Sequence, residues 1–174
     1  QRNLISEKAS DQYQRDFKKL SLDILSASSF LNWVELYKKF IYWKIELMEL
    51  ENNSMLNILE NQLKEANLVF GKFIKKNYLG WVNSKDNTPT LSHNVFKNKI
   101  IPHLNKSSPT LLILIDNLRF DQWKIIEPLV SKYYNVQKED LYCSILPTTT
   151  QYSRNSFFAG LTPNEIKNKF PDLW

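Results

Sequence analysis

Two short motifs in the second half of the chain combine a carboxylate with hydroxyl groups. Asp116 directly follows an apolar run at residues 110–115, and the turn at residues 147–150 reads Pro-Thr-Thr-Thr. A carboxylate is a hard oxygen ligand for a divalent cation, and the cation lowers the pKa of a neighbouring hydroxyl so that it can attack phosphorus. Placed side by side, the two motifs would therefore form a metal-activated nucleophile site.

The elements around these motifs predict how they could meet. The apolar run at residues 110–115 is typical of a strand buried on both faces, a helical pattern covers residues 119–134, and residues 141–146 indicate a second strand. Such a βαβ unit has parallel strands, whose carboxyl ends share the sheet edge at which ligands bind. The second turn also leads into a helix, whose N-terminal N–H groups suit a phosphate.

Both motifs also have a purely structural interpretation. An aspartate after a buried strand is common, and threonine-rich turns usually cap helices. The pattern after Thr150 is helical as far as Ala159, where Gly160 is a C-terminal stop, and residues 162–165 form a capping box for a further short helix. The two motifs thus predict local structure whether or not they carry chemistry.

The first half of the chain predicts three helices. Residues 1–78 contain no proline, and apolar residues recur there at helical spacing. The first helix has one apolar stripe, the second begins near Ser28 and Ser29 and has two, and the third begins at Asn53 and Ser54. The third is expected to end at the lysine cluster Lys72, Lys75 and Lys76. A second helix that is apolar on two sides needs two partners, which three-helix packing or dimerisation would supply.

Polar clusters divide the chain. Residues 83–89 and 105–109 are rich in turn-forming side chains, with a short helical stretch at residues 92–104 between them. We therefore expect a helical linker or bundle at residues 1–80, a connecting segment with a short helix at 81–105, and the start of an α/β domain at 106–174. The predicted fold class is a helical bundle followed by an opening βαβ unit.

The composition excludes a few classes of protein. The chain has 174 residues, 43% of them hydrophobic, and a net charge of +5 that permits an anionic partner without requiring one. The longest apolar run, residues 111–115, is far too short to cross a bilayer, and we expect no secretory leader. We expect a cytoplasmic protein with no membrane contact, in which Cys143, within an apolar stretch, is a buried structural thiol.

The motifs carry a family resemblance. Residues 115–123 and 145–155 resemble the start of the PglZ domain in the alkaline phosphatase superfamily. More closely, the chain looks like the effector half of the PorX-like response regulators, in which a receiver domain, a helical linker and a PglZ domain follow one another and act with type IX secretion in Bacteroidetes. Residues 32–37 and 70–74 resemble the linker of the same proteins. The resemblance implies an alkaline-phosphatase-like parallel-sheet domain, of which this chain holds the opening part.

The same resemblance assigns roles to individual residues. Asp116 matches the metal ligand after the first strand, and Thr150 matches the nucleophile that also binds metal, with Thr148 and Thr149 as the nearest alternatives. Arg154 matches an arginine that can hold a phosphate oxygen through its planar fork. The further candidates for binding phosphate or orienting a ligand are Asn117 and Arg119.

The implied cofactor is zinc in a two-metal site. In this superfamily further Asp and His ligands come later in the domain, whereas His93 and His103 both precede the first predicted strand. We expect the remaining ligands, and the receiver domain, to lie outside these 174 residues, which alone should be inactive. Two strands are also too few for a covered parallel sheet.

Two functions stay open at this stage. The first is a two-component response-regulator effector whose intact PglZ domain is a zinc-dependent phosphodiesterase or phosphohydrolase, with a cognate histidine kinase upstream. The second is a non-catalytic signalling module that forms a homodimer through the helical half or docks transcription or secretion regulators. A third, weaker idea is direct nucleic-acid binding by the basic helical half, which predicts a steep salt dependence.

Several other residues allow a plain interpretation. Asp121 either orients a neighbouring ligand or is a solvated helix residue, and Arg119 either binds phosphate or makes a surface ion pair. His93 and His103 are expected at helix ends or on the surface rather than as ligands. The tryptophans expected to be packing anchors are Trp33, Trp43 and Trp81.

Overall fold

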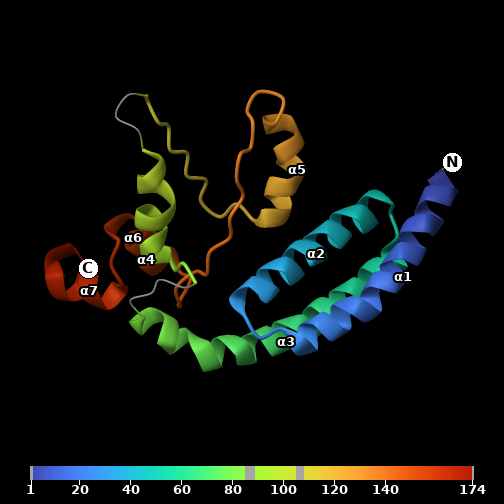
Figure 1. The fold of residues 1–174 in the computed structure, drawn as a ribbon, viewed down its shortest axis with the longest axis horizontal. Helices are drawn as coiled ribbons and strands as arrows, with labels where there is room; N and C mark the ends of the chain where they lie inside the picture. Colours follow the sequence, from blue (N-terminus) through green and yellow to red (C-terminus); the bar gives the residue numbers. More distant parts are fainter. Residues whose placement is uncertain (1, 85–88, 105–107, 174) are drawn as a thin grey trace. The chain divides into compact units, whose positions relative to one another are not determined.

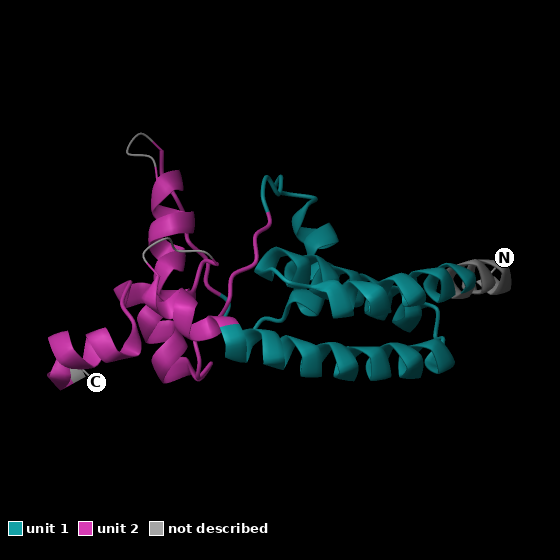
Figure 2. Cartoon of the chain, turned by 60° about the horizontal axis from the view of Figure 1, so that its bottom comes forward, with its two compact units in different colours: residues 1–76, 115–138 teal, residues 77–114, 139–174 magenta. Residues whose placement is uncertain are grey.

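The computed structural model describes residues 2–84, 89–104 and 108–173. Figure 1 shows its helices, and Figure 2 shows the two compact units into which the chain divides. The first unit comprises residues 1–76 and 115–138, and the second comprises residues 77–114 and 139–174. The segment that follows the first predicted strand is thus grouped with the helical half. The sequence-based boundaries of residues 1–80, 81–105 and 106–174 stay predictions.

The first unit is built on α1 (Arg2–Ser26), α2 (Phe30–Glu49) and the greater part of α3 (Asn53–Asn83). Ser29 caps α2: its hydroxyl accepts a bond from the Asn32 N–H at 3.2 Å, and its own N–H donates to the Asn32 side chain at 3.1 Å. The predicted helix starts are confirmed. The predicted end of α3 at Lys72, Lys75 and Lys76 is wrong, because lysine is a good helix former and the next polar turn cluster begins only at Asn83.

The three helices of the first unit enclose one hydrophobic core. The Trp43 ring lies 5.2 Å from the Tyr13 ring of α1, and the Trp33 ring lies 5.1 Å from the Phe70 ring of α3. The prediction that α2 packs on two partners within the chain is confirmed, as are Trp33 and Trp43 as packing anchors. The buried core residues are Tyr13, Leu20, Ile24, Trp33, Leu36, Phe40, Trp43, Leu47, Leu59 and Ala66.

A buried glutamine ties α3 to α1 inside this core. The Gln62 amide nitrogen donates to the Phe17 carbonyl and to the Ser21 hydroxyl, both at 2.9 Å. The Tyr13 hydroxyl donates to the Gln62 side-chain oxygen at 3.5 Å, and burial raises the pKa of Tyr13 to about 12. Because a buried amide is costly without partners, these bonds fix the register of the two helices.

Helix α5 (Phe120–Val130) belongs to the first unit and packs on α2. The Phe120 ring lies 5.8 Å from the Tyr37 ring, and the ammonium group of Lys124 lies 5.4 Å from the centroid of the Phe120 ring. The helix predicted over residues 119–134 is confirmed in kind, but it ends at Val130 and a turn follows.

The predicted βαβ unit is wrong for the described residues, which contain no strand. Residues 111–115 are irregular and exposed, with Leu111 at 83% and Ile115 at 59% of full exposure. Residues 141–146 make a single parallel bridge, between Cys143 and Leu91. A parallel strand needs hydrogen-bonded neighbours and cover on both faces, and no other described segment pairs with residues 111–115.

The second unit is a compact group of short helices. After the end of α3, its next helical stretch is continuous through α4 (Ser92–Val95), η1 (Phe96–Ile100) and η2 (Ile101–His103), as predicted for residues 92–104. The chain later forms α6 (Thr150–Ala159), α7 (Pro163–Lys169) and η3 (Pro171–Leu173).

The ends of these later helices follow the predicted signals. Gly160 ends α6 with a left-handed φ of 65°, a conformation that glycine adopts without strain. The Thr162 hydroxyl accepts a bond from the Glu165 N–H at 3.3 Å and so caps α7. Both predicted helix boundaries are confirmed.

The second unit has its own small core between α4 and α6. The Phe96 and Phe157 rings meet edge to face at 6.2 Å. Cys143 is buried there, and burial raises the pKa of its thiol to about 11, so the predicted structural thiol is confirmed. His93 lies in the single turn of α4, so its predicted place at a helix end is confirmed, although its side chain is buried and burial lowers its pKa.

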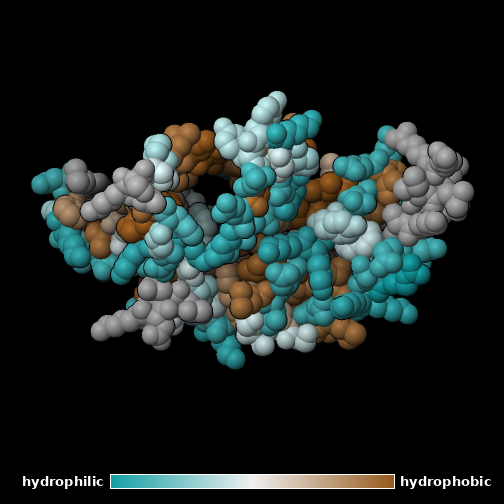
Figure 3. Space-filling view, turned by 45° about the horizontal axis from the view of Figure 1, so that its top comes forward, coloured by the Kyte–Doolittle hydropathy of each residue, from teal (hydrophilic) through white to brown (hydrophobic). Residues whose placement is uncertain are grey.

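Within the residues that the structure describes, no helix combines the length and hydrophobicity that a bilayer crossing demands. Hydrophobic side chains nevertheless remain on the surface, as the brown areas between hydrophilic ones in Figure 3 show. The most exposed large ones on the long helices are Leu22, Leu25, Leu31, Leu68 and Leu79.

Candidate functional site

The threonine-rich turn leads directly into α6. Thr149 is the N-cap residue with an extended backbone, and Thr150 is the first helical residue. The first helical backbone bonds run from the N–H groups of Tyr152 and Ser153 to the Thr149 carbonyl, at 3.0 and 2.9 Å. The N–H groups of Thr150 and Gln151 precede these bonds and stand at the positive end of the helix dipole.

Thr150 and Arg154 lie four residues apart on α6, which places them on the same face of the helix. Both side chains are exposed, as are those of Thr148 and Thr149. A planar guanidinium and helical N–H groups bind the oxygens of a phosphate ester, and a hydroxyl can attack its phosphorus. The structure therefore brings together the two predicted residues of this motif.

A network of serine hydroxyls holds the segment that precedes this turn. The Ser153 hydroxyl lies 3.0 Å from that of Ser144 and 3.2 Å from that of Ser92. The Ser92 hydroxyl also accepts a bond from the Ile145 N–H at 3.1 Å. Since Ser92 is fully buried and Ser153 is on α6, these bonds tie the segment, α4 and α6 into one arrangement.

Two hydrogen bonds donated by backbone N–H groups also hold this segment. The Cys143 N–H donates to the Thr90 carbonyl at 3.0 Å, and the Leu146 N–H donates to the Tyr78 hydroxyl at 2.6 Å. Leu146 is the last residue before the threonine-rich turn, so the turn leaves from a fixed point. Sequence reasoning missed this network, because isolated serines and a tyrosine give no signal of pairing at such separations.

Asp116 and its neighbours lie in the first unit. Asp116 and Asn117 form a turn, in which Asn117 has a left-handed φ of 61°, a conformation that asparagine tolerates better than most residues. Both side chains are exposed. After Leu118 the chain reaches Arg119, the N-cap residue of α5, whose N–H donates to the Gln122 side chain at 3.0 Å.

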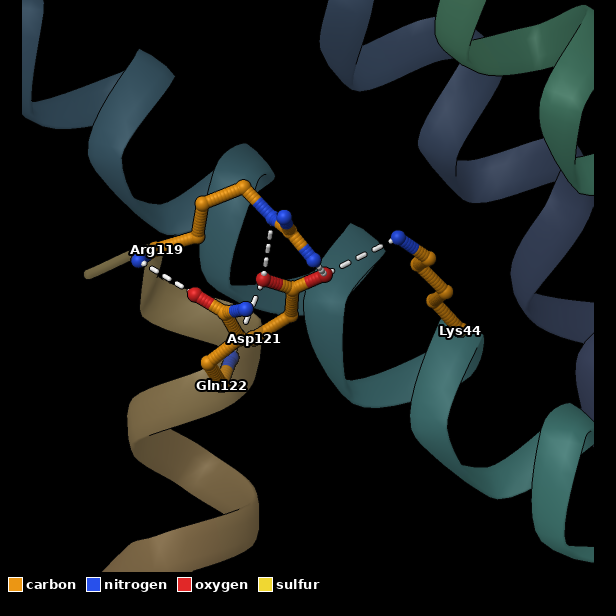
Figure 4. Close-up of polar contacts among 4 residues, drawn as sticks. All are labelled: Lys44, Arg119, Asp121 and Gln122. Carbon is orange, nitrogen blue, oxygen red and sulfur yellow. Dashed lines mark hydrogen bonds and ion pairs between the residues drawn. The ribbon is translucent and has the colours of Figure 1, made fainter. Parts of the chain in front are cut away.

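The best-formed polar cluster of the first unit surrounds Asp121 (Figure 4). The Lys44 ammonium of α2 donates to one carboxylate oxygen at 3.0 Å. The Arg119 guanidinium and the Gln122 N–H donate to the other oxygen, each at 3.0 Å. Asp121 is only 7% exposed, so the expectation of a solvated residue is wrong. Arg119 makes an ion pair in the structure, and its phosphate-binding role stays a prediction.

The electrostatics of this cluster favour the ionised form of Asp121. The hydrogen bonds from Arg119 and Lys44 lower its pKa from 3.8 to about 2, against the opposing effect of burial. Asp121 also lies in the first turn of α5, where the helix dipole stabilises a negative charge. The carboxylate is therefore a structural counter-ion that joins α5 to α2.

The predicted site residues thus form two groups. Asp116, Asn117 and Arg119 belong to the first unit, and Thr150 and Arg154 belong to the second. Among the described residues there is no group of three or more His, Cys, Asp or Glu that could hold a metal ion. The exposed carboxylate of Asp116 fits the chemistry of one oxygen ligand, but the described residues supply no complete ligand set.

Comparison with family models gives two matches. Residues 3–82 match the PorX response regulator linker domain, and residues 95–174 match the BREX system PglZ alkaline phosphatase-like domain. No curated protein matches the chain. The matches follow one another along nearly the whole sequence and confirm the resemblance carried by the helical half and by the two motifs.

Replacing Asp121 with asparagine tests the counter-ion role. We expect the free energy of unfolding at pH 7 to fall by about 1–2 kcal/mol, a modest value because both cations are partly exposed and screened by water. The pKa of Asp121 is lower in the folded than in the unfolded state, so its stabilising effect is complete above about pH 4 and is lost as the pH falls toward about 2. Urea unfolding should show that the difference in unfolding free energy between the wild type and Asp121→Asn is constant from pH 7 to pH 5 and shrinks below pH 4.

The exposed acid Asp172 of η3 provides the matched control. Its replacement with asparagine should change the unfolding free energy by less than about 0.5 kcal/mol at each pH. An Asp121→Asn variant as stable as the wild type at pH 7, or a difference that grows as the pH falls, would contradict the assignment.

Proposed function

We propose that this chain, which joins a PorX-type response regulator linker domain to PglZ-type alkaline phosphatase-like sequence, is part of a response-regulator effector that hydrolyses phosphodiesters. The observation that carries this proposal is the order of the two family matches, residues 3–82 and then 95–174. The linker implies a receiver domain as its context. In the proposal, a cognate histidine kinase controls that receiver, and the protein acts in the cytoplasm.

Thr150 is the nucleophile in this proposal. Its hydroxyl oxygen attacks phosphorus and forms a new O–P bond, the bond to the departing alcohol breaks, and the hydroxyl proton passes to that alcohol. Water then cleaves the O–P bond to Thr150, which regains its proton and releases the phosphate monoester. The N-terminal N–H groups of α6 and the Arg154 guanidinium stabilise the negative charge on the phosphate oxygens. Support comes from the exposure of Thr150 and Arg154 and from their four-residue spacing on one helix.

Asp116 is a metal ligand in the same proposal, and the Thr150 hydroxyl is a second oxygen donor. Zinc, when bound, would lower the pKa of that hydroxyl. Asn117 and Arg119, next to Asp116 in the chain, are the proposed groups that bind phosphate or orient the ligand. The remaining ligands are proposed to come from residues outside this chain.

A second candidate function is a non-catalytic signalling module that dimerises and docks transcription or secretion regulators. The observation that favours it is the exposure of large apolar side chains on the linker helices. Leu22 and Leu25 are 67% and 71% exposed and stand three residues apart on α1, which places them on one face. Large contiguous apolar patches are rare on the surfaces of monomeric proteins.

A valine at position 150 tests the catalytic proposal. In the parent protein, which carries this chain with a complete PglZ domain, Thr150→Val should reduce hydrolysis of bis-p-nitrophenyl phosphate by at least about 100-fold, because valine has the same shape without the nucleophilic oxygen. Thr148→Val, in the same turn, is the matched control and should keep most of the activity. Unchanged turnover in Thr150→Val would remove this residue from its role, whereas a parent protein without any hydrolysis would favour the non-catalytic module.

Metal removal tests the cofactor. Dialysis of the parent protein against a strong chelator should abolish hydrolysis, and one or two equivalents of zinc should restore it. Metal content of the purified protein, measured by mass spectrometry, is the independent readout. Full restoration by magnesium with none by zinc, or full activity after chelation, would contradict the zinc assignment.

Sedimentation of the full chain tests the dimer. We expect self-association at about 100 μM that is lost in the double variant Leu22→Lys with Leu25→Lys, since two charges cannot be buried at a small interface without partners. Leu68→Lys, an equally exposed leucine on α3, is the control for added charge. A monomeric wild-type chain at that concentration would leave no dimer to explain.

A further inference from the structure

The turn that carries Asp116 is short and stands directly before α5. Three residues, Asn117 to Arg119, separate Asp116 from the first helical residue, Phe120. Asn117 has the left-handed φ of 61°, and the Arg119 N–H is bonded to Gln122 of the helix. The position of Asp116 therefore follows the position of the N-terminus of α5.

The N-terminus of α5 is in turn held on the linker helix α2. The Phe120 ring contacts the Tyr37 ring at 5.8 Å, and Asp121 pairs with Lys44 at 3.0 Å. Tyr37 and Lys44 are seven residues apart, two turns of α2, and so lie on the same face of that helix. One face of the linker thus receives the first two residues of α5.

The two cations that pair with Asp121 have different consequences. Arg119 lies two residues from Asp121, so its ion pair stays within the same segment. Lys44 lies 77 residues away and connects that segment to another element. The Asp121 side chain is only 10% exposed and the Lys44 side chain is 39% exposed, so water has little access to the carboxylate of this ion pair. Loss of the Lys44 ammonium would remove this ion pair and leave the Tyr37–Phe120 ring contact between α5 and α2.

We propose that Lys44 is a positioning residue for the phosphodiester reaction: through Asp121 it fixes the 116–119 turn on the linker, so that a movement of α2 moves Asp116. The inference rests on the proposed function for the role of Asp116 and extends it by naming a route from the linker to the reaction. In this proposal the linker helix α2 helps to position Asp116 and does not only connect two domains.

The test compares three variants of the parent protein. Lys44→Met keeps the aliphatic stem and removes the charge, Lys44→Arg keeps the charge, and Lys38→Met removes a charge from α2 that pairs with Glu35 on the same helix. We expect Lys44→Met to lower kcat for bis-p-nitrophenyl phosphate by at least about 10-fold with KM changed less than about 2-fold. Lys44→Arg and Lys38→Met should both stay within about 3-fold of the wild type.

A second measurement follows the turn itself without relying on catalysis. Hydrogen–deuterium exchange of a peptide covering residues 115–122 should be faster in Lys44→Met than in the wild type, and unchanged in Lys38→Met. Both expected results together support the positioning role. An active wild type whose kcat and exchange are unaffected by Lys44→Met overturns this inference and leaves the proposed function standing. A wild type without phosphodiesterase activity overturns both.

Discussion

The buried carboxylate of Asp121 is the constraint on which the placement of α5 depends. A carboxylate removed from water must be paired and hydrogen-bonded, and Lys44, Arg119 and the Gln122 N–H together meet that demand. Two of these donors are local, and the remaining one, Lys44, lies on α2. Together with the contact between the Tyr37 and Phe120 rings, it joins α5 to the helical half, from which residues 115–138 are distant in sequence.

A second constraint acts on the segments expected to be strands. Residues 111–115 have the apolar run of a buried parallel strand, yet they lie exposed, because such a strand is stable only between paired neighbours. Residues 141–146 are held in place without a sheet. The Leu91 bridge, the Ser92 hydroxyl and the Tyr78 hydroxyl take over the backbone bonds that a neighbouring strand would supply.

The parts of the structure that were predictable are those encoded locally. Ser29, Gly160 and Thr162 mark helix ends through bonds within a few residues, and the apolar stripes of the first two helices identify their buried faces. The ion pair of Lys44 with Asp121 spans 77 residues, and the bond between the Ser92 and Ser153 hydroxyls spans 61. No spacing rule reaches across such separations, so the groups that anchor the two motifs could not be foreseen, although the motifs themselves could.

The two candidate motifs therefore have independent supports. The Asp116 turn depends on the linker through α5, whereas the Thr150 turn depends on the serine network that joins α4 and α6. A ligand and a nucleophile that act on one phosphate must be held to within a fraction of an ångström. The position of Asp116 depends on contacts within the first unit, and that of Thr150 depends on contacts within the second.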